Sequence, residues 1–453
     1  MKKGDLVHIK ILEYVFPNIG IGKLENLRVI IKNVLPDQLV EGRISKIRKN
    51  RIEANLVSVL EKASYETEPV CDHSERCGGC LLQTMPYEMQ LAYKEKYVKG
   101  ILNQVSGESF EFQPIIPSPE PFGYRNKMEF SFGDAYYDGP LSLGLHERGK
   151  FYEIVTVNTC KLVDSDFTLI LKTALTYFQE KGTAFYHKGR HEGLLRHLVV
   201  RKGKQTGEIL INLVTSSQGE LIADEFTSAL LNLSVTGIIR GILHTINDSK
   251  SDTVQSDETR ILYGTEHMTE KLMDLSFDIS PYSFFQTNTL GAEKLYETVR
   301  QYVGKTKDKI IFDLYTGTGT IAQILSSVAK KVIGVEIVEE AVIKAKENAT
   351  INSITNCEFI AGDVLKVMDD LEEKPDIIIL DPPRSGIHPK AINKIINFKP
   401  DTFIYISCNP KTLLVDLPIF MEAGYDVKKA VAVDMFPMTG HTEVVCLLEK
   451  KFN

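Results

Sequence analysis

Residues 313–320 read Asp-Leu-Tyr-Thr-Gly-Thr-Gly-Thr, and this stretch decides the fold class of the C-terminal part of the chain. It follows the apolar run at 310–312 and precedes residues 321–330, whose apolar side chains recur with helical spacing. Gly317 and Gly319 let the backbone turn tightly and approach a ligand. A strand, a glycine-rich turn and a helix in this order predict the nucleotide-binding unit of a parallel α/β sheet.

The same alternation of strand and helix continues to the end of the chain. Further short apolar runs, all typical of buried strands, occur at residues 331–336, 357–361, 376–380, 402–407 and 443–448. Residues 339–350 between the first two runs have the pattern of an amphipathic helix. Continuous apolar strands that alternate with helices are typical of a parallel sheet covered on both faces. We therefore predict a Rossmann-like α/β domain over residues 281–453.

Two further units are expected upstream, so the chain is predicted to be multidomain. Residues 1–62 contain five short alternating segments separated by turn residues, which predict a small OB-like β-barrel. Residues 63–280 mix strand-like and helix-like segments, which favour a central α+β domain with a mostly antiparallel sheet. Within that range we expect a helix at 86–105, able to pack on the catalytic domain, and a polar loop at 247–259.

The distribution of charge favours RNA as a partner, although the net charge of the chain is −7. Residues 1–62 hold 12 Lys and Arg against 7 Asp and Glu, and the run Arg43–Arg51 has five basic residues and no acidic one. Such one-signed clusters are typical of phosphate-binding surfaces, and an ordinary solvated surface is the alternative. No apolar run is long enough to span a bilayer and no signal-peptide pattern is present, so we expect a cytoplasmic protein without a membrane partner.

Acidic residues near the glycine-rich turn indicate which cofactor binds there. Glu336 ends the next apolar run, where a carboxylate can bind both hydroxyls of a ribose. The pattern Gly-x-Gly-x-x-Ala at 317–322 also fits a dinucleotide-binding turn, so a nicotinamide-dependent oxidoreductase is an alternative. Two acids favour S-adenosylmethionine: Asp313 can orient the loop, and Asp363, which follows the third apolar run, can accept the amine of an adenine.

Three motifs place reactive side chains at strand ends. DPPR begins at Asp381 and ends one apolar run, SCNP contains Cys408 and ends the next, and HTE contains Glu443 at the start of the last. Ligands bind at the carboxyl ends of parallel strands, so a thiol there is placed for nucleophilic attack and a carboxylate for proton removal. A thiolate that adds to carbon 6 of uracil makes carbon 5 able to attack a methylsulfonium, and a base must then remove the carbon 5 proton.

Together with Phe-Phe-Gln-Thr-Asn at residues 284–288, these motifs resemble those of the RNA (uracil-5-)-methyltransferases. The resemblance covers nearly the whole chain and implies a class I S-adenosylmethionine-dependent methyltransferase with an N-terminal TRAM domain. It also implies that Cys408 is the covalent nucleophile and that Glu443 is the base. The residues that match positions contacting the cofactor or ordering the site are Gln286, Tyr315, Glu336 and Asp381. The family often has Phe at position 315, and the aromatic character is retained here.

The spacing of four of the cysteines indicates a metal site. Seven cysteines without a secretory signal argue against a disulfide framework. The spacing Cys71-x5-Cys77-x2-Cys80, with a distant Cys160, resembles the four ligands of a [4Fe-4S] cluster in the ribosomal-RNA branch of the family, and four thiolates are what such a cluster needs. Zinc is the alternative that the spacing leaves open. The cysteines expected to be buried and inert are Cys357 and Cys446.

The substrate implied by the cysteine motif is one or more uridines of 23S ribosomal RNA, with transfer RNA as the alternative. Basic residues within 124–127 and 188–201 are expected to contact phosphates, and the target base must leave its stack to reach Cys408. Rivals of other classes are the oxidoreductase and an RNA-binding protein without catalytic activity. In DNA cytosine-5 methylation the cysteine follows a proline, whereas Pro410 here comes two residues after the cysteine. No obligate protein partner is evident.

Overall fold

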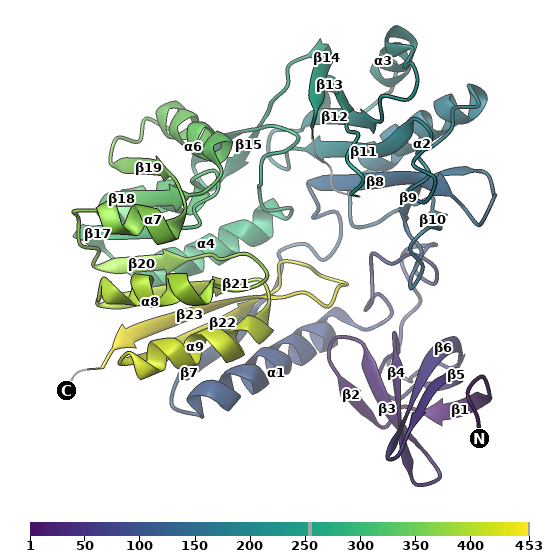
Figure 1. Ribbon diagram of the computed structural model, residues 1–453, viewed down its shortest axis with the longest axis horizontal. Helices are drawn as coiled ribbons and strands as arrows, with labels where there is room; N and C mark the ends of the chain where they lie inside the picture. Colours follow the sequence, from purple (N-terminus) through teal and green to yellow (C-terminus); the bar gives the residue numbers. More distant parts are fainter. Residues whose placement is uncertain (252–255, 452–453) are drawn as a thin grey trace.

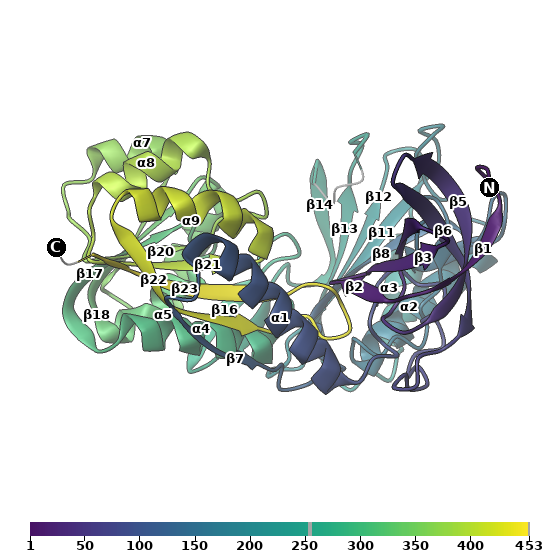
Figure 2. The same cartoon turned by 90° about the horizontal axis from the view of Figure 1, so that it is seen from below.

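The computed structural model describes residues 1–251 and 256–451 and contains three parts (Figure 1). Seen from below, the N-terminal barrel and the central sheet lie on one side and the C-terminal α/β domain lies on the other (Figure 2). Residues 252–255, within the polar loop expected at 247–259, lie outside the described residues. No helix in the described part of the chain is long and apolar enough to cross a membrane.

The first part is a six-stranded sheet with the order β1-β5-β6-β4-β3-β2. Its strands are β1 (Leu6–Lys10), β2 (Glu13–Val15), β3 (Ile19–Leu24), β4 (Leu27–Lys32), β5 (Leu39–Arg48) and β6 (Arg51–Glu61). A Cβ on Gly22 of β3 would lie 2.4 Å from a side-chain atom of Ile9 in β1, so the sheet curls back on itself into a barrel. Ile9, Val29 and Val40 fill its interior. The five expected segments all form strands, and β2 is an additional one.

A segment without helix or strand, residues 62–86, carries three of the seven cysteines and leads to the helix α1 (Tyr87–Ser106) and the strand β7 (Glu111–Ile116). Strand β7 pairs in parallel with a strand of the C-terminal sheet, and α1 buries Val98 and Leu102 against the same sheet. Both elements come from the range expected for the central domain, yet they complete the C-terminal one (Figure 1).

The central part is a seven-stranded sheet with the order β10-β9-β8-β11-β12-β13-β14, and only β12 and β13 pair in parallel. Its elements are β8 (Lys127–Asp134), β9 (Leu141–His146), β10 (Ile154–Val155), α2 (Ser165–Glu180), β11 (Leu195–Lys202), β12 (Glu208–Thr215), α3 (Ala223–Leu231), β13 (Ile238–Ile246) and β14 (Glu258–Gly264). Helices α2 and α3 pack their apolar faces on this sheet through Phe167, Phe178 and Phe226. A hairpin of β15 (Met268–Leu272) and β16 (Leu275–Ile279) follows.

The C-terminal part is an eight-stranded sheet with the order β19-β18-β17-β20-β21-β23-β22-β7. Its strands are β17 (Thr306–Leu314), β18 (Ala329–Glu336), β19 (Cys357–Ala361), β20 (Ile377–Leu380), β21 (Thr402–Ser407), β22 (Tyr425–Val433) and β23 (Glu443–Lys450), besides β7. Its helices are α4 (Thr289–Val303), α5 (Thr320–Leu325), α6 (Glu339–Ile351), α7 (Val364–Asp370), α8 (Pro389–Asn397) and α9 (Leu413–Glu422), besides α1. The predicted Rossmann-like domain is confirmed.

Both faces of this sheet are buried, which explains the continuous apolar strands. In β20, Ile377 and Ile379 face the layer of α4, α5 and α6, whereas Ile378 and Leu380 face the layer of α1, α7, α8 and α9. Strand β23 runs antiparallel to β21, so its first residue lies at the edge where the parallel strands end. That edge faces the central part of the molecule (Figure 1).

Candidate active site

The strand register brings three sequence motifs to one edge of the C-terminal sheet. Leu380 of β20 pairs with Tyr405 of β21, and Ser407 of β21 pairs with Val444 of β23. Asp381 follows Leu380, Cys408 follows Ser407, and Glu443 precedes Val444, so all three lie at this edge. The thiol therefore lies on the strand between the two that carry the carboxyl groups.

Burial and neighbouring charges raise the pKa of the three acidic groups at this edge. Burial, followed by the charges of Glu443 and Asp381, raises the pKa of the Cys408 thiol to about 11. Burial and the charge of Asp381 raise the pKa of Glu443 to about 8. Burial and the charge of Asp313 raise the pKa of Asp381 to about 7. Such shifts are typical of groups that exchange protons during a reaction near neutral pH.

Arg384 supplies the opposing positive charge. Its guanidinium lowers the pKa of both Cys408 and Glu443, although burial outweighs it in each case. The side chain of Asn409 donates to the backbone carbonyl of Arg384 at 3.1 Å, so the SCNP turn is tied to the DPPR turn. The backbone N–H of Asn409 in turn donates to the hydroxyl of Ser407 at 3.2 Å, which shapes the turn around the thiol.

The glycine-rich turn is built around Asp313 and Glu336. One oxygen of Asp313 accepts hydrogen bonds from the hydroxyl of Thr316 at 2.5 Å and the N–H of Ala322 at 3.0 Å, while its other oxygen is buried without a partner. Glu336 accepts from the N–H of Gly317 at 3.1 Å. The space in front of Gly317 is open: the atom nearest to a Cβ added there would be a ring carbon of Phe284, 4.0 Å away. An open cradle beside an unpartnered acid fits a polar nucleoside cofactor.

Two more expected cofactor residues lie beside this turn. Tyr315 has a left-handed backbone (φ 68°), uncommon for a side chain of this size and typical of functional turns. Burial and the charge of Asp363 raise the pKa of Tyr315 to about 12, so the two side chains are neighbours. One oxygen of Asp363 accepts from the N–H of Leu365 at 2.9 Å and caps α7. Asp363 therefore has a structural role besides the expected one.

Gln286 connects the central part to the cofactor edge. Its backbone carbonyl accepts a hydrogen bond from the side chain of Asn126 at 2.8 Å, and its side chain bonds to the hydroxyl of Tyr296. Tyr296, in α4, is buried, and the charges of Asp381 and Glu443 add to burial in raising its pKa. Sequence reasoning did not single out Tyr296, because an aromatic residue at an apolar position of an amphipathic helix has the pattern of an ordinary core residue.

The four cysteines expected as cluster ligands come together, although 80 residues separate Cys80 from Cys160. Burial and the neighbouring thiols raise the pKa of Cys80 to about 12 and that of Cys160 to about 11. All four thiols are free, and Cys71 and Cys77 are buried. Within residues 1–251 and 256–451, however, no group of three or more His, Cys, Asp or Glu side chains has the arrangement of a metal site. The expected iron–sulfur cluster is therefore not shown.

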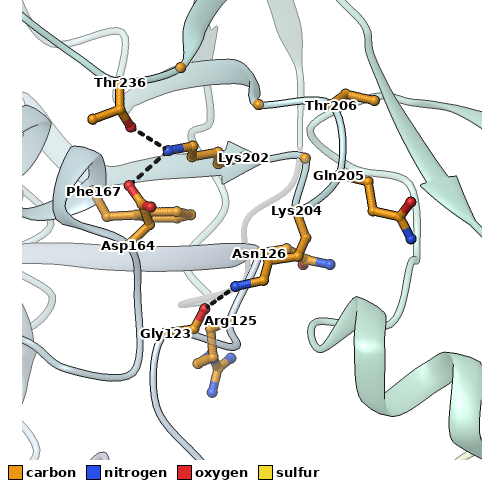
Figure 3. Close-up of a pocket in the computed structure, with 13 residues that line it drawn as sticks. Gly123, Arg125, Asn126, Asp164, Phe167, Lys202, Lys204, Gln205, Thr206 and Thr236 are labelled. Carbon is orange, nitrogen blue, oxygen red and sulfur yellow. Dashed lines mark hydrogen bonds and ion pairs between the residues drawn. The ribbon is translucent and has the colours of Figure 1, made fainter. Parts of the chain in front are cut away.

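A cavity lies in the central part of the molecule, and none of the residues around Cys408 lines it. It has a volume of about 330 Å³ and lies between the start of β8, the end of β11 and the start of β13. Lys202 donates to Asp164 at 2.8 Å and to Thr236 at 2.9 Å, and Lys204 donates to the carbonyl of Gly123 at 3.2 Å (Figure 3). Both ammonium groups are therefore already paired within the chain.

The doubly covered sheet, the glycine-rich turn with its paired acid, and the acidic strand ends define an α/β enzyme of the S-adenosylmethionine-dependent methyltransferase class. Residues 86–451 match the family described as tRNA (uracil-5-)-methyltransferase. The chain is 47% identical over 451 residues to an uncharacterized RNA methyltransferase of Clostridium tetani, covering 100% of this chain and 99% of the relative. It is 46% identical over 450 residues to one of Caldanaerobacter subterraneus subsp. tengcongensis, covering 99% and 100%.

A solved structure agrees with these relatives. The tRNA (uracil-54, C5)-methyltransferase of Pyrococcus abyssi, in complex with S-adenosyl-L-homocysteine, matches with a TM-score of 0.76 and 28% identity, over 97% of this chain and 99% of that chain. The chain therefore belongs to the RNA (uracil-5-)-methyltransferase family, and the resemblance read from its motifs is confirmed.

Proposed function

We propose that this protein transfers a methyl group from S-adenosylmethionine to carbon 5 of a uridine in structured RNA, with Cys408 as nucleophile and Glu443 as base. The observation that carries the proposal is the register of β21 and β23, which pairs Ser407 with Val444. Cys408 and Glu443 are the next residues on these two strands, so their side chains lie next to each other. A thiol beside a buried carboxyl group is what a reaction through a covalent uracil adduct requires.

The first step needs the thiolate of Cys408. Because burial raises the pKa of this thiol to about 11, it is protonated at rest, and its proton passes to solvent water when the thiolate forms. The guanidinium of Arg384 is the positive charge that favours the thiolate. The thiolate forms a bond to carbon 6, and the electron pair of the C5–C6 double bond moves toward oxygen 4. Carbon 5 thereby becomes nucleophilic. Bound S-adenosylmethionine supplies an electrophilic methyl group to this carbon.

The last step needs the carboxylate of Glu443. It takes the proton from carbon 5, the electrons of that C–H bond restore the C5–C6 double bond, and the bond between carbon 6 and the sulfur of Cys408 breaks. The thiolate is thereby regenerated. A base with a pKa of about 8 is well matched to a carbon acid at physiological pH, because it binds the proton more firmly than an ordinary carboxylate.

The residues proposed to hold the cofactor surround the glycine-rich turn. The open space in front of Gly317 supports an approach for the cofactor, and Glu336 accepts from the N–H of Gly317 beside it. Glu336 is proposed to bind the ribose hydroxyls and Asp363 to accept the adenine amine. The remaining residues of the proposed cofactor site are Gln286, Tyr315 and Asp381. Asp313 supports the site by fixing the conformation of the turn through its hydrogen bonds with Thr316 and Ala322.

We propose large-subunit ribosomal RNA as the substrate, on the strength of the four cysteines. Transfer RNA is the second candidate, favoured by the match to the Pyrococcus abyssi enzyme. In either RNA the target base must swing out of its stack, and Arg125 and Arg384 are placed to hold the flanking phosphates, since both charges act on His441 at the edge of the site.

The four cysteines are proposed to hold a [4Fe-4S] cluster, with zinc as the alternative. Support comes from Arg148, whose side chain donates to the carbonyls of Ser74 and Cys80 at 2.7 Å each. Its Nε is buried without a partner, and the charges of Cys77 and Cys80 act on the guanidinium. A buried cation with an unused donor beside thiolates suits a negatively charged group.

The test is transfer of labelled methyl from S-adenosylmethionine to ribosomal and transfer RNA that lack 5-methyluridine. We expect labelled 5-methyluridine with wild type and with the control Cys357→Ala, and none with Cys408→Ala. The RNA that takes the label identifies the substrate class. Equal transfer by Cys408→Ala, or label at another atom of the RNA, would contradict the proposal.

A further inference from the structure

The loop from Asp434 to Thr442, here called the base loop, joins β22 to β23 and ends at Glu443. Only His441 in this loop is exposed, which is unusual because loops normally keep their backbone groups in water. A buried loop needs a partner for every polar group. The residues that supply these hydrogen-bond partners therefore fix the position of the loop, and with it the position of Glu443.

Four consecutive carbonyls of the base loop, those of residues 435–438, accept hydrogen bonds from elsewhere in the chain. The carbonyl of 435 accepts from Asn288 at 3.0 Å, that of 436 from Lys94 at 3.0 Å, and that of 437 from the hydroxyl of Tyr124 at 3.1 Å. The carbonyl of 438 accepts from two backbone N–H groups that directly follow Cys80 in the chain, at 2.9 and 3.1 Å. The loop is thus held by α1, the cysteine segment, the central part and the FFQTN segment together.

The barrel contacts the same loop. A Cβ on Gly440 would lie 2.3 Å from the Cβ of Pro17, so only glycine permits this approach. In α1, the side chain of Gln90 accepts from the N–H of Met438 at 3.0 Å and donates to the carbonyls of Leu82 and Met85. The base loop is therefore the point at which all parts of the molecule meet.

Lys94 makes the strongest of these contacts. Its ammonium is 2.6 Å from the carboxylate of Asp434, and both side chains are fully buried. Burial lowers the pKa of Lys94, and the ion pair with Asp434 opposes this effect. Burying two charges is costly, and such a pair holds a particular geometry better than it adds stability. The neighbour of Asp434, Val433, pairs with Glu443 across the strands, so the ion pair lies one residue from the partner of the base.

We propose that Lys94 is a positioning residue for Glu443: by holding Asp434 and the carbonyl of Phe436, it sets the base loop so that the carboxylate of Glu443 reaches carbon 5 of the methylated uracil. The inference rests on the proposed function and adds to it the residue that positions the carboxylate of Glu443. It assigns Lys94 to one step only, removal of the carbon 5 proton. The residues proposed to hold the cofactor and the nucleophile Cys408 lie outside the base loop.

The test compares Lys94→Met, which keeps the length of the side chain and removes its charge, with Lys96→Met on the exposed face of the same helix. Single-turnover reactions with RNA tritiated at carbon 5 of uridine report proton release, and denaturing gels report the covalent RNA–protein adduct. We expect Lys94→Met to slow proton release by about tenfold or more and to accumulate methylated adduct, as Glu443→Gln would, with an unchanged KM for S-adenosylmethionine. Lys96→Met should behave as wild type.

Asp434→Asn keeps the inference testable if Lys94→Met does not fold, because it is nearly isosteric and should give the same adduct. Proton release that keeps pace with methyl transfer in a folded variant, or loss of activity without adduct, would overturn the role of Lys94. Failure of the proposed function has a different signature: wild type would then form no adduct, or Cys408→Ala would transfer methyl as well as wild type does.

Discussion

The carboxyl groups of Asp381 and Glu443 lie at the ends of β20 and β23, on either side of the strand that presents Cys408. Burial and then the charge of Asp381 raise the pKa of Glu443 to about 8. Two carboxyl groups whose charges act on each other in a partly buried site do not both ionise readily. The pair therefore controls the pH at which the proposed base carries its charge.

Activity should consequently rise with pH through the neutral range. A carboxyl group with a raised pKa is ionised only above that pKa, so the fraction of Glu443 able to accept the carbon 5 proton rises with pH. We expect kcat to increase about tenfold per pH unit below pH 8 at saturating S-adenosylmethionine. Asp381→Asn removes the neighbouring charge and should shift the profile to lower pH. A flat profile between pH 6 and 9 would contradict this assignment.

Replacement of the base should trap the reaction after methyl transfer. In Glu443→Gln the carbon 5 proton has no acceptor, so the bond between carbon 6 and Cys408 cannot break. We expect a methylated RNA–protein adduct that survives denaturing electrophoresis and turnover reduced by about 10²-fold or more. Glu449→Gln, further along the same strand, is the control and should form no lasting adduct. Normal turnover by Glu443→Gln would reject the role of this residue.

Tyr296 should act on cofactor binding through Gln286. Tyr296→Phe removes the hydroxyl that bonds to Gln286, and loss of one such buried hydrogen bond costs about 1 kcal/mol. We expect the KM for S-adenosylmethionine to rise by about fivefold and the maximal rate to fall less. Tyr302→Phe, on the same helix, removes a hydrogen bond to Gln113 of 2.9 Å and serves as the matched control. Equal KM values in the two variants would show that Tyr296 is only a core residue.

The cysteine group should bind iron. Protein purified without oxygen is expected to be brown with about four irons per chain. Cys80→Ser should lose the metal, whereas Cys357→Ser, outside the group, should keep it. Colourless protein with about one zinc per chain would establish the alternative ligand set. Protein free of both metals, with unchanged activity, would leave the thiols as packing groups.

The sequence predicted those features that depend on local pattern. Apolar runs of strand length, each ending in a polar motif, predicted both the parallel sheet and the gathering of Asp381 and Cys408, because the carboxyl ends of parallel strands meet at one edge. Glu443 begins its strand and reaches the same edge only because β23 runs antiparallel to β21. The family also followed from short motifs. The helix at 86–105 was predicted, because its apolar spacing lies within a single segment.

How that helix and the strand after it join the C-terminal sheet was decided by the tertiary structure. The helix was expected to be able to pack on the catalytic domain and does so, but both α1 and β7 fall in the range expected for the central domain, and the pairing of β7 with β22 was not predicted. Lys94 has the composition of a solvent-facing residue and becomes a buried partner only because Asp434, 340 residues away, is brought to it. The raised pKa of Glu443 has the same origin, since burial and charge proximity arise only when distant strands pair.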